Sequence, residues 1–109
     1  MGDPRWGTYV LVLGVGDEAL LPSEYALHQN YPNPFNPTTT IRFDIVEQGH
    51  VTLNIYNLLG QRVGTLVNQQ LDPGFHSVQW NASSIASGVY LYTIEMNNFA
   101  KSRKLLIIK

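Results

Sequence analysis

A glycine-rich stretch near the start of the chain has the spacing of a phosphate-binding loop. The segment Gly14-Val15-Gly16-Asp17-Glu18-Ala19 follows a β-forming run and matches the GxGxxA form of the dinucleotide fingerprint. Nucleotide binding needs a helix that opens at the glycines and a carboxylate about 20 residues further on. Pro22 interrupts such a helix, and a proline cluster stands where the acid is required. We therefore interpret the stretch as a linker that follows a strand.

Residues for acid–base or metal chemistry are few and scattered. The candidates are His28, His50 and His76 and the acids Asp44, Glu47, Asp72 and Glu95. None of the histidines has a histidine partner two or four residues away, and a glycosidase needs two carboxylates held across a cleft. No GxSxG elbow and no calcium-loop pattern occurs. We expect no catalytic residues, no metal site and no cofactor.

Two patterns raise the possibility of a carbohydrate function. Asn81-Ala82-Ser83 has the pattern of a glycosylation sequon, a triplet that is also common by chance. Tyr90 and Tyr92 share one face of a predicted strand, and Trp80 could lie near them. Planar rings on one sheet face can stack on sugars, but in so small a domain they more often fill the core. The core interpretation is favoured.

Composition excludes several classes of partner. The net charge is −1 and only 14% of residues are charged, against about 25% in typical domains. No basic field attracts nucleic acid or an anionic membrane, although the last nine positions hold four cations. There is no cysteine, and therefore no disulfide. Residues 1–4 lack the pattern of a signal peptide, so we expect the chain to be a piece of a longer protein.

Alternating apolar and polar residues predict an all-β domain. The predicted strands are 8–13, 39–45, 51–55, 63–67, 76–80, 89–96 and 104–108. The last run has four consecutive apolar residues, which predicts burial on both faces or at a sheet centre. Asp72-Pro73-Gly74 predicts a type II turn, and Asn97-Asn98 a tight hairpin. Short strands every ten residues or so indicate a small antiparallel β-sandwich.

A proline-rich segment precedes the first regular strand. Pro32, Pro34 and Pro37 push their neighbours to extended backbone, so we expect 30–37 to be extended and stiff. Tyr31 and Phe35 provide two large apolar anchors. The segment is therefore predicted to be a strap along the edge of the domain rather than a flexible linker.

Five motifs in order give the sequence a family resemblance. They are "YPNPFNPTTTIRFDI", "VTLNIYNLLGQRVGTLV", "LDPGFHSVQWNA", "ASGVYLYTIE" and "KLLIIK". Together they resemble the type IX secretion system type A C-terminal sorting domain, which is similar to the immunoglobulin-like module of the flagellar hook-capping protein. The resemblance covers about 21–109. It implies an immunoglobulin-like β-sandwich of about seven strands. We divide the chain into a preceding cargo region or linker with one possible strand (1–20), the strap (21–37) and the sandwich (38–109).

The resemblance also implies a function. Such domains direct a cargo protein from the periplasm through the outer-membrane translocon of a Gram-negative bacterium, and a sortase-like peptidase then attaches the cargo to the cell surface. The peptidase is expected to cut within 14–29. The recognition residues implied by position are Gly88, Tyr90, Lys104, Leu105, Leu106, Ile107, Ile108 and Lys109. The implied opening motif is Asn33, Pro34, Phe35, Asn36 and Pro37.

We expect the domain to act by docking, with the terminal strand offering its backbone edge and apolar side chains to the translocon. Two alternatives stay open. One is a structural spacer or assembly module in which strand edges join copies of the domain. The other is a carbohydrate-binding accessory module of a secreted hydrolase.

Overall fold

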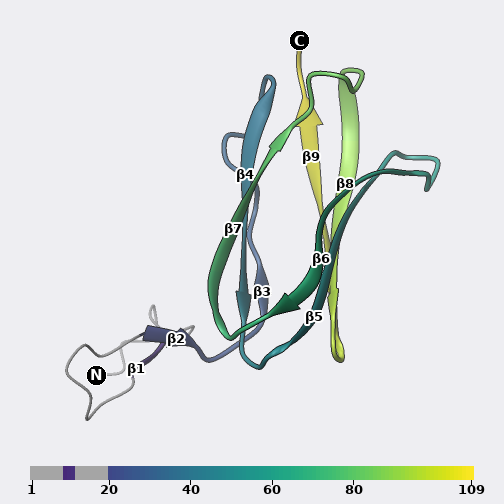
Figure 1. The fold of residues 1–109 in the computed structure, drawn as a ribbon. Coiled ribbons are helices and arrows are strands. Elements are labelled where there is room, and N and C mark those ends of the chain that lie inside the picture. Colours follow the sequence, from purple (N-terminus) through teal and green to yellow (C-terminus); the bar gives the residue numbers. More distant parts are fainter. Residues whose placement is uncertain (1–8, 12–19) are drawn as a thin grey trace.

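The computed structural model describes residues 9–11 and 20–109, whose regular secondary structure consists of antiparallel strands (Figure 1). One sheet has the order β3-β4-β7, from β3 (Ala26–Leu27), β4 (Thr38–Ile45) and β7 (Gly74–Asn81). The other has the order β6-β5-β8-β9, from β5 (Gly49–Tyr56), β6 (Arg62–Leu71), β8 (Gly88–Met96) and β9 (Phe99–Ile107). The two sheets face each other, so the predicted small β-sandwich is confirmed.

A separate pair of strands precedes the sandwich. β1 (Tyr9–Leu11) and β2 (Leu20–Pro22) pair with each other and with no strand of the two larger sheets. The strand predicted near the start of the chain therefore exists but does not join the sandwich, whose sheets of three and four strands give the expected seven. The glycine-rich stretch at 14–19 lies outside the described residues. No helix in the described part is long and apolar enough to cross a membrane.

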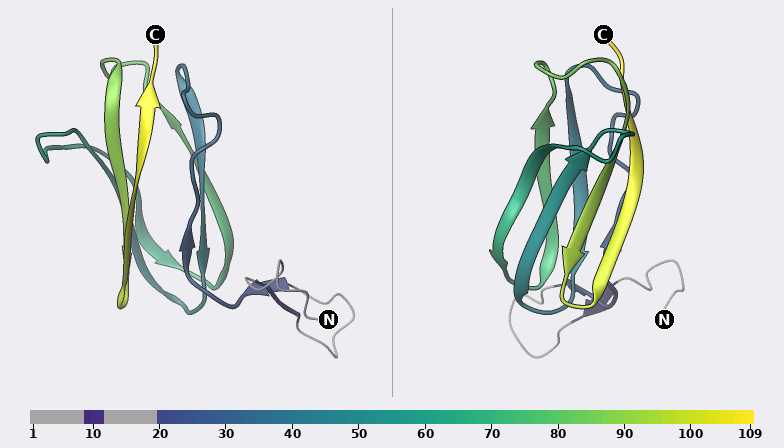
Figure 2. Two further views of the ribbon diagram at one scale, coloured as in Figure 1. Left: turned by 180° about the vertical axis from the view of Figure 1, so that it is seen from behind. Right: turned by 90° about the vertical axis from the view of Figure 1, so that its right-hand side faces the viewer.

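The core lies between the two sheets, which face each other in Figure 2, and its residues follow the two-residue period of the strands. On β8, every second residue is buried, from Tyr90 to Met96. The residues of β4 and β5 that point into the space between the sheets are Ile41, Phe43, Ile45, Val51, Leu53 and Ile55, each at most 1% exposed. Burying one such side chain stabilises the fold by about 1.5–3 kcal/mol. Alternation in the sequence thus marks the inner face of each central strand.

Residues that favour turns stand between the paired strands. Met96 pairs with Phe99, so Asn97 and Asn98 form the predicted two-residue loop, and Asn97 has a positive φ of 50°. Gly74 also has the expected positive φ, but at 153° it differs from the value of about +80° that a type II turn requires. Gly74 is already the first residue of β7, which explains its more extended backbone.

The final strand differs from its prediction. β9 is an edge strand, not a central one, and it begins at Phe99. Only every second residue of its apolar run is buried: Leu105 and Ile107 are 1% exposed, whereas Ile108 is 50% exposed. The four consecutive apolar residues therefore do not reflect a central position. A second element pairs with the outer edge of β9.

That element is the strap, which bends instead of running straight. Bends occur at 32–34 and 36–37, and the peptide bonds before Pro32, Pro34 and Pro37 are cis. The Asn30 side-chain amide holds the first bend by donating to Pro32 O (3.1 Å) and Thr39 Oγ1 (3.0 Å). Only one of the two predicted aromatic anchors is buried: Phe35 is 2% exposed and Tyr31 is 76% exposed.

Candidate functional site

The opening motif and the terminal segment meet in space. The Phe35 amide donates to Leu106 O (3.1 Å), and the Ile108 amide donates to Phe35 O (3.0 Å). The Leu106 amide donates to the side-chain oxygen of Asn33 at 3.0 Å. Phe35 thus forms a parallel bridge to Ile107 of β9. Two motifs at opposite ends of the family region make one continuous structure.

The predicted recognition residues Gly88 and Tyr90 belong to β8, on the other side of β9 from the strap. In the antiparallel pairing of β8 with β9, Gly88 is opposite Ile107 and Tyr90 is opposite Leu105. Gly88 has a φ of 152°, which favours glycine, and the Tyr90 hydroxyl donates to Ala86 O (2.8 Å) to close the preceding turn. We call this assembly of 33–37, 88–90 and 104–109 the terminal junction.

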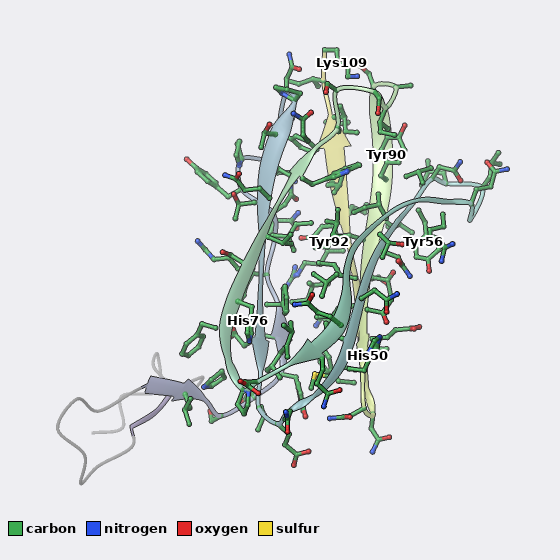
Figure 3. All side chains as sticks on the ribbon, viewed as in Figure 1. His50, Tyr56, His76, Tyr90, Tyr92 and Lys109 are labelled. Atoms are coloured by element: carbon green, nitrogen blue, oxygen red, sulfur yellow. The ribbon has the colours of Figure 1, made fainter. Side chains whose placement is uncertain are left out.

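Core packing and loop contacts hold the terminal junction in place. The rings of Phe35 and Trp80 lie 5.9 Å apart, which ties the strap to β7 in the opposite sheet. Ala82 donates its amide to Pro37 O at 2.8 Å. Lys109, at the end of the sandwich in Figure 3, donates from Nζ to Ser83 O at 2.8 Å. The junction therefore connects both sheets.

Four of the thirteen predicted recognition and opening-motif residues are inaccessible. Phe35, Tyr90, Leu105 and Ile107 are buried, so they shape the site without being able to touch a partner. The exposed members of the junction are Asn33, Pro34, Asn36, Pro37, Val89, Lys104, Ile108 and Lys109, and Leu106 and Gly88 are half-buried. Any direct recognition at the junction must use these side chains.

The terminal part of the β9 edge is not free, contrary to the docking mode expected from the sequence. Backbone groups of an antiparallel strand point alternately to either side, and those of Leu106 and Ile108 point to the strap. The Gln29 side chain, which the sequence did not single out, donates to Lys104 O at 2.7 Å. The strap already fills the place that an added strand would take.

Two hydrogen bonds of the Tyr92 hydroxyl hold the strap at His28 and Asn30. Its ring is fully buried between the sheets, and its hydroxyl donates to His28 O (2.6 Å) and accepts from the Asn30 amide (2.8 Å) (Figure 3). Burial raises the pKa of Tyr92 above 10.0, although the Asn30 amide and the Arg103 guanidinium oppose this rise. The hydroxyl therefore stays a neutral hydrogen-bonding group.

Each histidine has its own structural partner. His28 Nε2 lies 3.0 Å from Asp44 Oδ2, His50 Nε2 lies 2.6 Å from Asn68 Oδ1, and His76 Nε2 lies 2.8 Å from Asp72 O. His50 and His76 lie on different sheets in Figure 3. Among residues 9–11 and 20–109, no three histidines and carboxylates are placed to hold a metal ion.

The sugar-stacking interpretation of the aromatic residues is wrong. Trp80 and Tyr90 are 8% exposed and Tyr92 is 0% exposed, so the three rings fill the core and offer no platform. The sequon has a local structural role as well. Asn81 Oδ1 accepts from the amide and the hydroxyl of Ser83 at 2.9 and 2.6 Å, which forms the turn after β7.

Comparison with known proteins agrees with this architecture. The chain is 31% identical over 97 residues to an endo-acting ulvan lyase of Formosa agariphila; the match covers 89% of the chain and 17% of the lyase. The chain thus spans less than a fifth of this relative's length. A family model for the secretion system C-terminal sorting domain matches residues 29–109, from the strap to the end of the terminal junction. The chain therefore belongs to the family of type IX secretion system C-terminal sorting domains.

Proposed function

We propose that this domain directs the protein that carries it through the type IX outer-membrane translocon, as a docking module without catalysis of its own. The observation that carries the proposal is the extent of the family match. It begins at the strap and ends with the terminal segment. Hydrogen bonds between Phe35, Leu106 and Ile108 join these two ends, so the folded domain presents them as one surface.

Recognition at this surface would use side chains rather than a free strand edge. Lys104, Ile108 and Lys109 offer two cations and an exposed aliphatic group, and Asn33 and Pro34 flank them on the strap. The buried residues Leu105 and Ile107 hold the segment against the core. A partner would therefore recognise the shape and charge of the terminal segment, whose backbone is already paired with the strap.

The remaining partners follow from the same assignment. A cargo domain would precede the sorting domain, and a sortase-like peptidase would cut the chain within 14–29 before the cargo is attached to the cell surface. The strap supports this order of events. Pairing of β3 with β4 and the hydrogen bonds of the strap fix the chain from Ala26 onward, so the cleavable part would lie upstream of the folded unit.

The test must separate recognition from folding. Deleting 105–109 from a full-length cargo protein is expected to leave the cargo in the periplasm. That deletion also removes the buried Leu105 and Ile107, so retention alone would be ambiguous. The sharper variant is Ile108→Asp with Lys109→Glu, which changes exposed side chains only. We expect this variant to accumulate in the periplasm.

The matched control is Leu59→Asp, the same kind of substitution at a side chain that is 84% exposed in the β5–β6 loop. We expect this control to be exported as the parent is. Urea denaturation of the isolated 109-residue chain must give the same midpoint for both variants and for the parent. Normal export of the Ile108→Asp, Lys109→Glu cargo would contradict recognition at the terminal junction.

A further inference from the structure

The edge strands of the sandwich are not equally protected. β3 has only two residues. β6 has two register shifts in its pairing with β5, at Leu53/Asn54 and Ile55/Tyr56. β9 has the cations Lys101, Arg103 and Lys104, and the strap covers its end. Short length, bulges, lysines and covering segments are the devices by which proteins keep strand edges from pairing with other chains.

β7 has no such device in its own sequence; β2 lies beside β7 but does not pair with it. It runs for eight residues in uninterrupted register with β4 and contains no lysine, arginine, aspartate, glutamate or proline. The backbone amide and carbonyl of Thr40 in β4 both bond to Tyr31, and therefore point away from β7. Thr40 is opposite Gln79 in the β4–β7 pair, so the amide and carbonyl of Gln79 point away from β4, to the open side of β7. By alternation Ser77 does the same. No described strand pairs with β7 on that side.

A groove lies beside this open edge. It has a volume of about 300 Å³ and opens between β6 and β7. Its apolar lining comes from Phe43, Leu66, Val67, Leu71 and Val78. Asn68, Gln69, His76 and Ser77 supply polar groups, and the lining contains no aspartate, glutamate, lysine or arginine. An extended segment paired with β7 would therefore find room for an apolar side chain next to its backbone.

The opposite edge of the molecule shows how such a segment binds. The strap pairs with β9 through the Phe35 backbone, while the Phe35 ring enters the core beside Trp80. Backbone hydrogen bonds at a sheet edge, combined with pockets for alternate side chains, are the general mode of β-augmentation. The β7 edge offers the same two components without an occupant from the described residues.

We propose that the β7 edge and its groove bind an extended, uncharged segment of a partner protein with apolar residues at alternate positions. A second copy of the chain fits less well. In a β7–β7 pair, the inward side chains His76, Val78 and Trp80 of each copy already pack within their own sandwich, so the groove would stay empty. The inference rests on the proposed function, because it names a surface by which the sorting domain would engage its transport machinery.

The direct test uses a synthetic peptide as the probe. Acetyl-Thr-Val-Thr-Val-Thr-Val-amide is titrated into the 109-residue chain, and amide hydrogen exchange is followed by NMR. We expect exchange at Ser77 and Gln79 to slow about tenfold at saturation, because those amides gain acceptors. The same peptide N-methylated at every residue has no amide to donate along a ladder, and it is expected to leave both amides unchanged.

A pair of proline variants assigns the effect to one edge. Gln79→Pro removes an outward amide and leaves the β4 ladder intact, so we expect about tenfold weaker peptide binding. Ser102→Pro is the matched control on β9, where the Ser102 amide also points outward, by alternation from Leu106. The Ser102→Pro variant is expected to bind the peptide as tightly as the parent does. Gln79→Ala keeps the backbone amide at position 79, so it is also expected to bind the peptide as the parent does. Thermal unfolding checks that each variant is folded.

Several outcomes would overturn the inference. One is an unchanged rate of amide exchange at Ser77 and Gln79 at millimolar peptide. Another is the same loss of peptide affinity in Gln79→Pro and in Ser102→Pro. Sedimentation that shows a dimer which the peptide cannot dissociate would assign the edge to a second copy instead. In cells, normal export of Gln79→Pro cargo beside retained Ile108→Asp, Lys109→Glu cargo would reject β7 as the docking edge while the proposed function stands.

Discussion

At the scale of single residues, Tyr92 links the strap to the sheet it must cover. The side chain is in the middle of β8, yet its hydroxyl bonds to the backbone of residues 62 and 64 positions earlier in the chain. Asn30, one of its partners, is only 2% exposed. No water can easily replace the hydroxyl there, so this contact matters more than a surface hydrogen bond.

Replacing Tyr92 with phenylalanine should destabilise the domain. The variant keeps the buried ring but leaves the Asn30 amide and the His28 carbonyl without a side-chain partner, at a cost of about 1–3 kcal/mol. Urea denaturation measures the change. Tyr56→Phe is the control, because the Tyr56 hydroxyl has only a 3.2 Å contact with Asn54 and lies on a half-buried side chain. Equal stability of the two variants would show that the Tyr92 bonds contribute nothing special.

Tyr92 also predicts an alkaline effect. Its pKa is raised above 10.0 in the folded state, so the folded chain retains the phenolic proton more strongly than the unfolded chain. This contribution to stability is complete below pH 10 and is lost as the pH rises through the folded pKa. The free energy of unfolding of the parent should therefore fall more steeply above pH 10 than that of Tyr92→Phe. Parallel curves from pH 8 to 11.5 would contradict the raised pKa.

At the scale of elements, the two strap aromatics offer a matched pair of variants. Phe35→Ala removes a buried ring that contacts Trp80, and we expect a loss of about 3–5 kcal/mol in the free energy of unfolding. Tyr31→Ala removes a ring that is 76% exposed, and we expect a change within about 0.5 kcal/mol. Guanidinium denaturation checks both. A small effect at Phe35 would mean that the strap is not part of the core.

The sequence predicts the central strands better than the edges. Alternation located β4, β5 and β8, because each of these strands has one buried face. It missed β3, which is too short to show a period, and the first half of β9, where Ala100, Lys101 and Ser102 are exposed. The parts of the terminal junction were recognisable as motifs. Their meeting was not, because pairing between Asn33 and Leu106 across 73 positions leaves no local pattern.

At the scale of the whole molecule, the core found among the residues whose burial is described lies in the family region and the few residues before it. The buried hydrophobic cluster runs from Leu27 to Ile107. We therefore expect a chain that lacks residues 1–20 to unfold in one cooperative transition, with a free energy within about 1 kcal/mol of the parent. Calorimetry measures both. A broad transition, or a much larger loss, would place the start of the folded unit upstream of the strap.

The pairing of strap and β9 also sets a time order for assembly. A growing chain gains about 5–20 residues per second, so the 73 positions between Asn33 and Leu106 take roughly 4–15 seconds to make. During that interval Phe35 has no edge to pair with, and β8 lacks its outer neighbour. The strap is thus among the first parts of the sandwich to be synthesised and the last to be secured. Until β9 is made, the outer edge of β8 stays open to pairing with other chains.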